Sequence, residues 1–135
     1  MLTHHNGIPE NGVQTVPPLK LFGEVTGAFA GQQPPAYWYW GHVHAGVAYK
    51  PTAHQNGMLC RCVGHSALPW GVSSDLQVSA NVEWFETRNA GDPDDVLRVL
   101  NGFVFLQLSG ATLKETYYDE NGGGGLTRGW GGLRK

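Results

Sequence analysis

Histidine is the residue type in this sequence with the clearest capacity for chemistry, and it occurs as His4, His5, His42, His44, His54 and His65. Two of these lie in the motif Gly41-His42-Val43-His44, directly after an aromatic segment. On extended backbone, side chains at i and i+2 point the same way, so both imidazoles could meet a metal centre. An isolated His-x-His is also common in ordinary surface loops, and the motif alone leaves both interpretations open.

A second histidine pair lies near the amino terminus, in Leu2-Thr3-His4-His5-Asn6. Its apolar residues indicate the end of a strand. The segment from Pro17 to Phe29 predicts a helix, because its apolar residues share one helical face and proline suits a first helical turn. The expected order is therefore strand with His-His, helix, aromatic strand with Gly-His-x-His.

This order resembles the last two sequence blocks of the calcineurin-like metallophosphoesterase superfamily. Further stretches similar to one branch of that family are Tyr49, Cys60-Arg61-Cys62-Val63-Gly64-His65 with Leu68-Pro69, Asn101-Gly102-Phe103 and Tyr117-Tyr118-Asp119. The resemblance covers the chain from Leu2 to about Asp119.

The resemblance implies a divalent metal site with His4 and His42 on one metal and His44 on the other. Zn, Mn, Fe and Co all suit imidazole ligands. His5 is implied to lie beside the ligands or on the substrate side. His65 matches the rim of the family's pocket, although a hydrogen-bonded loop histidine is an equal alternative. We expect His54 to be an exposed loop residue.

The family's upstream blocks, D-x-H, G-D-x-x-D and G-N-H-[DE], are absent from this sequence. They supply the bridging carboxylate that holds two metals ~3.5–4 Å apart for phosphoester hydrolysis. Gly91-Asp92-Pro93-Asp94-Asp95 resembles the second block superficially, but it follows the Gly-His-x-His motif and indicates a turn. The metal site is therefore expected to be incomplete.

These observations predict a truncated metallophosphoesterase that is inactive or very weak alone, and the start at Met1 inside a family block fits a truncated gene, a fragment or half of a split protein. One alternative is half of a split metal-dependent phosphoesterase, completed by a partner chain that carries the missing N-terminal half. Another is a small β-rich binding or structural protein whose histidines are incidental. Whether the chain is an enzyme stays open at this point.

The predicted fold class is α+β, mostly β: half of a metallophosphoesterase-type αββα sandwich with a largely antiparallel or mixed sheet and one N-terminal helix. Residues 1–121 are expected to form a single domain, followed by a Gly-rich tail over residues 122–135. Expected strands are residues 36–40 and 46–49, paired as a hairpin, then 58–63, 82–88, 102–108 and 112–119. Residues 64–81 show no period and predict a long loop.

The composition of the sequence argues against nucleic acid and against a membrane as partners. The formal net charge is −2 and the nine basic residues do not cluster, which argues against nucleic acid. No apolar run approaches the ~20 residues of a membrane span, and we expect a cytoplasmic protein. Cys60 and Cys62 are expected to be reduced and buried. Strands apolar on both faces would leave one face uncovered in half a sandwich, which predicts a homodimer or higher oligomer.

Overall fold

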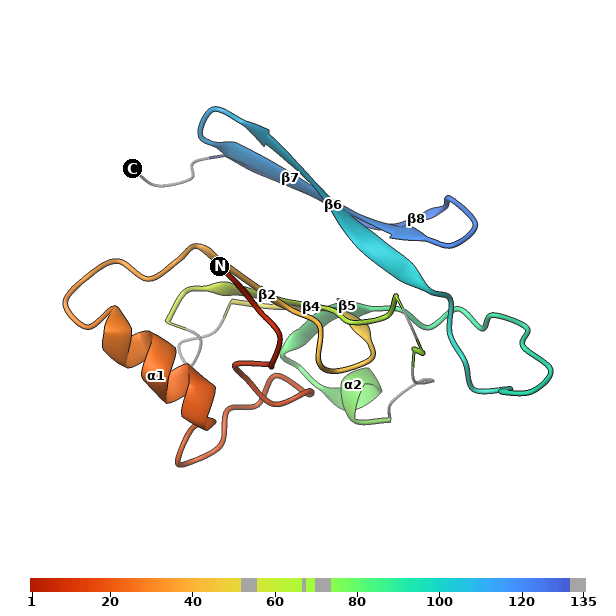
Figure 1. Cartoon of the computed structure of the whole chain (residues 1–135), viewed down its shortest axis with the longest axis horizontal. Helices are drawn as coiled ribbons and strands as arrows, with labels where there is room; N and C mark the ends of the chain where they lie inside the picture. Colours follow the sequence, from red (N-terminus) through yellow and green to blue (C-terminus); the bar gives the residue numbers. More distant parts are fainter. Residues whose placement is uncertain (52–55, 67, 70–73, 132–135) are drawn as a thin grey trace.

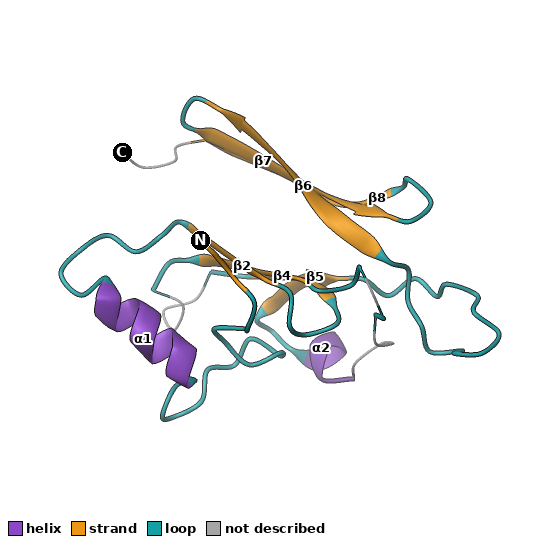
Figure 2. Cartoon of the chain, viewed as in Figure 1, coloured by secondary structure: helices purple, strands orange, loops and turns teal. Residues whose placement is uncertain are grey.

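The structure, a computed structural model, describes residues 1–51, 56–66, 68–69 and 74–131. Its elements form three layers, with two helices on one face of a five-stranded sheet and a three-stranded sheet on the other face (Figures 1 and 2). The protein is thus of the α+β class and mostly β, as the sequence predicts. Neither described helix has the length and apolar character that crossing a membrane requires.

The five-stranded sheet is mixed. In spatial order it contains β1 (Leu2–Thr3), β2 (Tyr37–Trp40), β4 (Leu59–Val63), β3 (Gly46–Tyr49) and β5 (Val82–Phe85). The first three run parallel, and β3 is antiparallel to both of its neighbours. The expected hairpin of residues 36–49 is therefore wrong, because β4 lies between β2 and β3.

The three-stranded sheet is antiparallel, in the order β6 (Gly102–Ser109), β7 (Thr112–Asp119) and β8 (Gly124–Gly131). The hairpin of β6 and β7 agrees with the prediction. The strand β8 falls in the segment that the sequence separates as a Gly-rich tail. Main-chain hydrogen bonds to β7 form this strand, and glycine supplies them as well as any residue.

Two helices cover the other face of the five-stranded sheet (Figure 2): α1 (Lys20–Ala28) and α2 (Ser74–Val78). The first confirms the predicted N-terminal helix, and its buried Phe22 stacks on Trp38 with ring centroids 6.3 Å apart. The second lies within the predicted loop of residues 64–81. It is a single short turn of helix held by buried Leu76, too brief to show a period.

The aromatic strand β2 contributes side chains to the packing on both faces of the five-stranded sheet. All four of its side chains are buried. Trp38 and Trp40 join the apolar core on the helix side, and Tyr37 and Tyr39 pack toward the three-stranded sheet. Because successive side chains of a strand point to opposite faces, this sequence of bulky residues requires cover on both sides.

A buried ion pair joins the two sheets. Arg61 of β4 and Glu115 of β7 are both 0% exposed. The Arg61 Nε and Nη2 atoms each lie 2.8 Å from Oε1 of Glu115, and the Tyr39 hydroxyl donates to Oε2 at 2.8 Å. Burial acts to lower the pKa of Arg61, but the hydrogen bond and charge of Glu115 outweigh it and keep that pKa above its ordinary value.

His65 is a second buried polar group between the sheets. It is 1% exposed, and a Cβ added at Gly46 or Gly102 would come within 2.7 or 2.4 Å of its ring. Its carbonyl accepts a hydrogen bond from the Gly102 N–H at 2.9 Å, at the start of β6. The imidazole thus packs where only glycine leaves room. Burial lowers the pKa of His65, and the charge of Glu86 opposes that shift.

We expect Glu115→Gln to destabilise the protein by about 3–5 kcal/mol, because it leaves the Arg61 charge buried without its counter-ion. Tyr39→Phe removes only one hydrogen bond to a charged group and should cost about 1.5–3 kcal/mol. Urea denaturation of both variants measures these losses. Equal stability of Glu115→Gln and the wild type would contradict the role of the ion pair.

We also expect stability to fall as the pH drops below about 6.5, where the unfolded imidazole of His65 takes up a proton that the folded protein resists. The slope from this one group is at most about 1.4 kcal/mol per pH unit. Urea midpoints measured from pH 8 to pH 5 should therefore change less in His65→Gln than in the wild type. Parallel losses in the two proteins would show that another group is responsible.

Candidate metal centre

His4 and His42 follow the carboxyl ends of two parallel strands. Strands β1 and β2 are paired in parallel, with Thr3 opposite Trp40, and α1 lies between them in the sequence. Their carboxyl ends therefore meet at one edge of the sheet, where sites of layered α/β structures tend to form. Beyond the last paired residues, the main-chain N–H groups of Gly41 and His42 lie 3.3 and 2.9 Å from the His4 carbonyl oxygen. His4 and His42 are thereby held side by side.

The Gly-His-Val-His segment bends instead of staying extended. The Ala45 N–H donates to the Val43 carbonyl at 2.8 Å, and the Cys62 thiol of β4 donates to the same oxygen at 3.1 Å. A Cβ at Gly64 would lie only 1.9 Å from that oxygen, so glycine is needed for β4 to approach the bend. The extended backbone on which the expectation for His42 and His44 depends is therefore absent from this segment.

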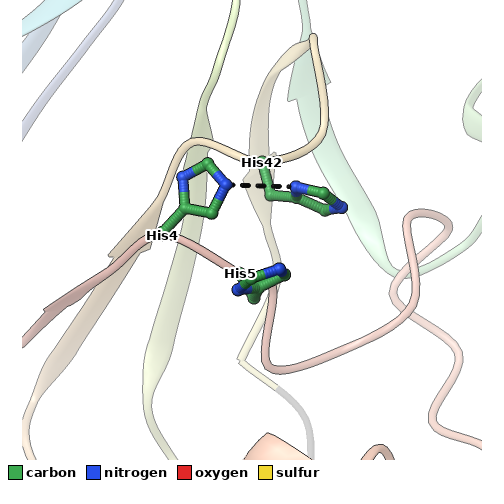
Figure 3. Close-up of side chains that lie close together, drawn as sticks. All are labelled: His4, His5 and His42. Atoms are coloured by element: carbon green, nitrogen blue, oxygen red, sulfur yellow. Dashed lines mark hydrogen bonds between the residues drawn. The ribbon is translucent and has the colours of Figure 1, made fainter.

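His5 joins His4 and His42 in one cluster (Figure 3). Each of the three offers a ring nitrogen, and these nitrogens all lie within 4.8 Å of one another. The ring centroids are 4.7 Å apart for His4 and His5, 4.5 Å for His5 and His42, and 5.1 Å for His4 and His42. We refer to these three residues as the histidine cluster.

The closest contact in the histidine cluster has the dimensions of a metal site. Nδ1 of His42 lies 3.3 Å from Nε2 of His4. Two imidazole nitrogens bound to one Zn²⁺ at ~2.0–2.1 Å with tetrahedral geometry are separated by roughly the same distance. A hydrogen bond between two neutral imidazoles also fits this distance, with one ring donating and the other accepting.

The surroundings of His42 favour its neutral form and lower its pKa. Loss of hydration lowers the pKa of His42, and the nearby His5, His4 and His44 lower it further. Metal binding requires the unprotonated ring, so this shift keeps His42 available as a ligand near neutral pH. All three rings are exposed, and within the described ranges no Asp or Glu belongs to the cluster.

His44 lies in a different environment. Its Nδ1 is 3.0 Å from the Leu68 carbonyl oxygen, and its side chain lines a depression of about 160 Å³ with Leu68, Pro69, Asp95 and Arg98. The sequence interprets residues 91–95 as a turn, and Asp92 indeed accepts main-chain hydrogen bonds from Asp94 and Asp95 within it. The sequence carries no signal that this turn brings a carboxylate and a guanidinium to the depression beside His44.

The remaining predicted residues are placed as follows. The structure brings His5 to His4 and His42, whereas His44 is not part of the cluster. His65 is buried between the two sheets and is not at the rim of a pocket with the other histidines. His54 lies outside the described residues.

Comparisons with protein-family models, with curated proteins and with solved structures find no match to this chain. Its functional interpretation therefore depends on the histidine cluster and on the fold that positions it.

Proposed function

We propose that this chain binds one divalent transition-metal ion through the histidine cluster, and that it corresponds to the C-terminal half of a metallophosphoesterase-type domain with little or no activity alone. The observation that carries the proposal is the 3.3 Å separation of the His4 and His42 ring nitrogens, with His5 close enough to add a third ligand. A tripod of imidazoles that leaves a water position open is a known type of hydrolytic zinc site.

The placement of His44 supports the family interpretation. The resemblance implies that His42 and His44 serve two different metals, and in this chain the two side chains occupy different environments. Two-metal phosphoester hydrolysis also needs ligands that bridge the ions. The histidine cluster offers neutral imidazoles only, so it can hold an ion without fixing a second one beside it.

The cysteines bear on the cellular setting that we propose, which is the cytoplasm. Cys60 and Cys62 are free and buried, and burial raises the pKa of the Cys60 thiol to about 12 and that of Cys62 to about 11. Both thiols therefore stay protonated and unreactive at neutral pH. Reduced cysteines of this kind fit a reducing compartment.

We expect tag-free protein to bind one equivalent of Zn²⁺ or Co²⁺, measured by isothermal titration calorimetry and by the visible absorption of Co²⁺. Removing a ligand in His5→Ala or His42→Ala should weaken binding by roughly 100-fold or more, beyond the 10- to 100-fold typical of residues that only orient ligands. His44→Ala is the matched control and should leave the affinity nearly unchanged, because His44 lies outside the cluster.

The same series separates the alternatives. Loss of binding in His44→Ala with retention in His5→Ala would instead support the ligand set implied by the resemblance, His4, His42 and His44. Absence of any stoichiometric metal in the wild type would contradict the proposed function, and the 3.3 Å contact would then be a hydrogen bond between imidazoles.

We further expect the isolated chain, loaded with Zn²⁺, Mn²⁺ or Co²⁺, to hydrolyse bis(p-nitrophenyl) phosphate no faster than the metal alone. The physical reason is the missing carboxylate bridge between two ions. Release of nitrophenolate, followed by absorbance, gives the rate. Robust turnover that disappears in His42→Ala would contradict the proposed lack of activity while leaving the metal site intact.

A further inference from the structure

Strand β6 presents apolar side chains to solvent on both of its faces. Phe103 is 55% exposed, Phe105 48%, Leu106 38% and Leu108 72%. Val104 packs into the core between the sheets, so Leu106 and Leu108 lie on that inner face, and Phe103 and Phe105 lie on the outer one. An aromatic side chain buries ~150–250 Å², and the four side chains together expose on the order of 400 Å² of apolar surface.

Past Gly102, whose N–H donates to the His65 carbonyl oxygen, the outer edge of β6 has no strand partner among the described residues. The order of its sheet is β6, β7, β8, so within the part of the chain that the structure describes only β7 pairs with β6. Exposed edge strands are commonly protected by charge, proline or a bulge. Residues 99–113 contain no charged residue and no proline, and β6 pairs with β7 in unbroken register from Gly102 to Ser109. This edge is therefore open to another strand.

A second copy of β6 fits this edge. A two-fold axis brings identical strands together antiparallel, and here that pairing opposes no like charges. Full overlap of the eight residues would pair Gly102 with Ser109. Side chains opposite each other must share a face, so the nearest allowed registers place either Phe105 or Leu106 on the axis. With Phe105 on the axis, Phe105 meets its own copy and Val104 meets Leu106; with Leu106 on the axis, Leu106 meets its own copy and Val104 meets Leu108.

The size of the exposed apolar surface also favours a second copy of this chain as the partner. The apolar patch of β6 supplies about half of the ~800 Å² per partner that a stable interface needs. A groove of about 240 Å³ continues it toward the five-stranded sheet, lined by Phe103, Val104 and Leu106 of β6 and by Leu2, Tyr39 and Val63. Leu2 is itself 78% exposed, so the apolar surface extends beyond the strand that pairs.

We propose that β6 is a dimerisation edge, at which two copies of this chain pair antiparallel through the part of β6 centred on Phe105 and Leu106 and join their three-stranded sheets into one continuous six-stranded sheet. The interface uses main-chain hydrogen bonds along β6 and contacts of Phe103, Phe105, Leu106 and Leu108 across the axis. It involves none of the histidine cluster and does not depend on metal.

Light scattering with size-exclusion chromatography at micromolar concentration tests this pairing. The wild type should have twice the 14.7 kDa mass of one chain. Phe105→Lys places two like charges at or beside the axis, and Leu108→Lys places a charge opposite Gly102 or Val104 of the other copy, so both variants should halve the measured mass. Leu97→Lys is the matched control, since Leu97 is 70% exposed like Leu108 at 72% but lies outside β6, and it should remain dimeric. Circular dichroism verifies that each variant is folded.

Oxidative cross-linking tests the register. Phe105→Cys or Leu106→Cys should yield a covalent dimer, whereas the native Cys60 and Cys62 are 0% exposed and should not. A monomeric wild type would overturn the second copy as the partner. A dimer that survives both lysine substitutions, or that neither cysteine traps, would overturn β6 as the interface.

Discussion

The ion pair of Arg61 and Glu115 is the contact on which the rest of the structure depends. Apolar surfaces attract each other without direction, so the inner faces of two sheets could slide by a residue at little cost. A buried charge does not permit this freedom, because leaving it unpaired costs several kcal/mol. Arg61 also donates from Nη1 to the carbonyl oxygens of Tyr49 and Cys60, which ties β3, β4 and β7 to one relative position.

Strand β4, which contains Arg61, connects the ion pair to the histidine cluster. In β4, Arg61 faces the three-stranded sheet, and its neighbour Cys62 points to the opposite face and donates to the Val43 carbonyl. Gly64, directly after the strand, leaves room for the bend that contains His42. The position of the bend is thus set by a strand whose register the ion pair determines. A change in the core between the two sheets would reach the histidine cluster through β4.

Local sequence patterns predict where the helices and strands lie better than they predict which strands pair with each other. The helix of residues 20–28 and the hairpin of β6 and β7 follow from apolar periodicity and a short turn. The insertion of β4 between β2 and β3 does not, because periodicity says which faces are buried and not which strands pair. The grouping of His5, and not His44, with His4 and His42 does not follow from local patterns either. The i, i+2 rule assumes extended backbone, and the bend depends on Cys62 and Gly64, which come from another strand.

The histidine cluster is organised by main chain and not by its own contacts. Its three rings are exposed, and contacts between exposed side chains contribute little to stability. What holds them together is the parallel pairing of β1 with β2 and the two N–H groups directed at the His4 carbonyl. An ion that binds here therefore loses little affinity to the ordering of flexible ligands, since the strands have already brought His4 and His42 together. His5, whose ring nitrogen lies within 4.8 Å of theirs, is the residue that distinguishes this cluster from the ligand set implied by the resemblance, which makes its substitution the most informative of the three.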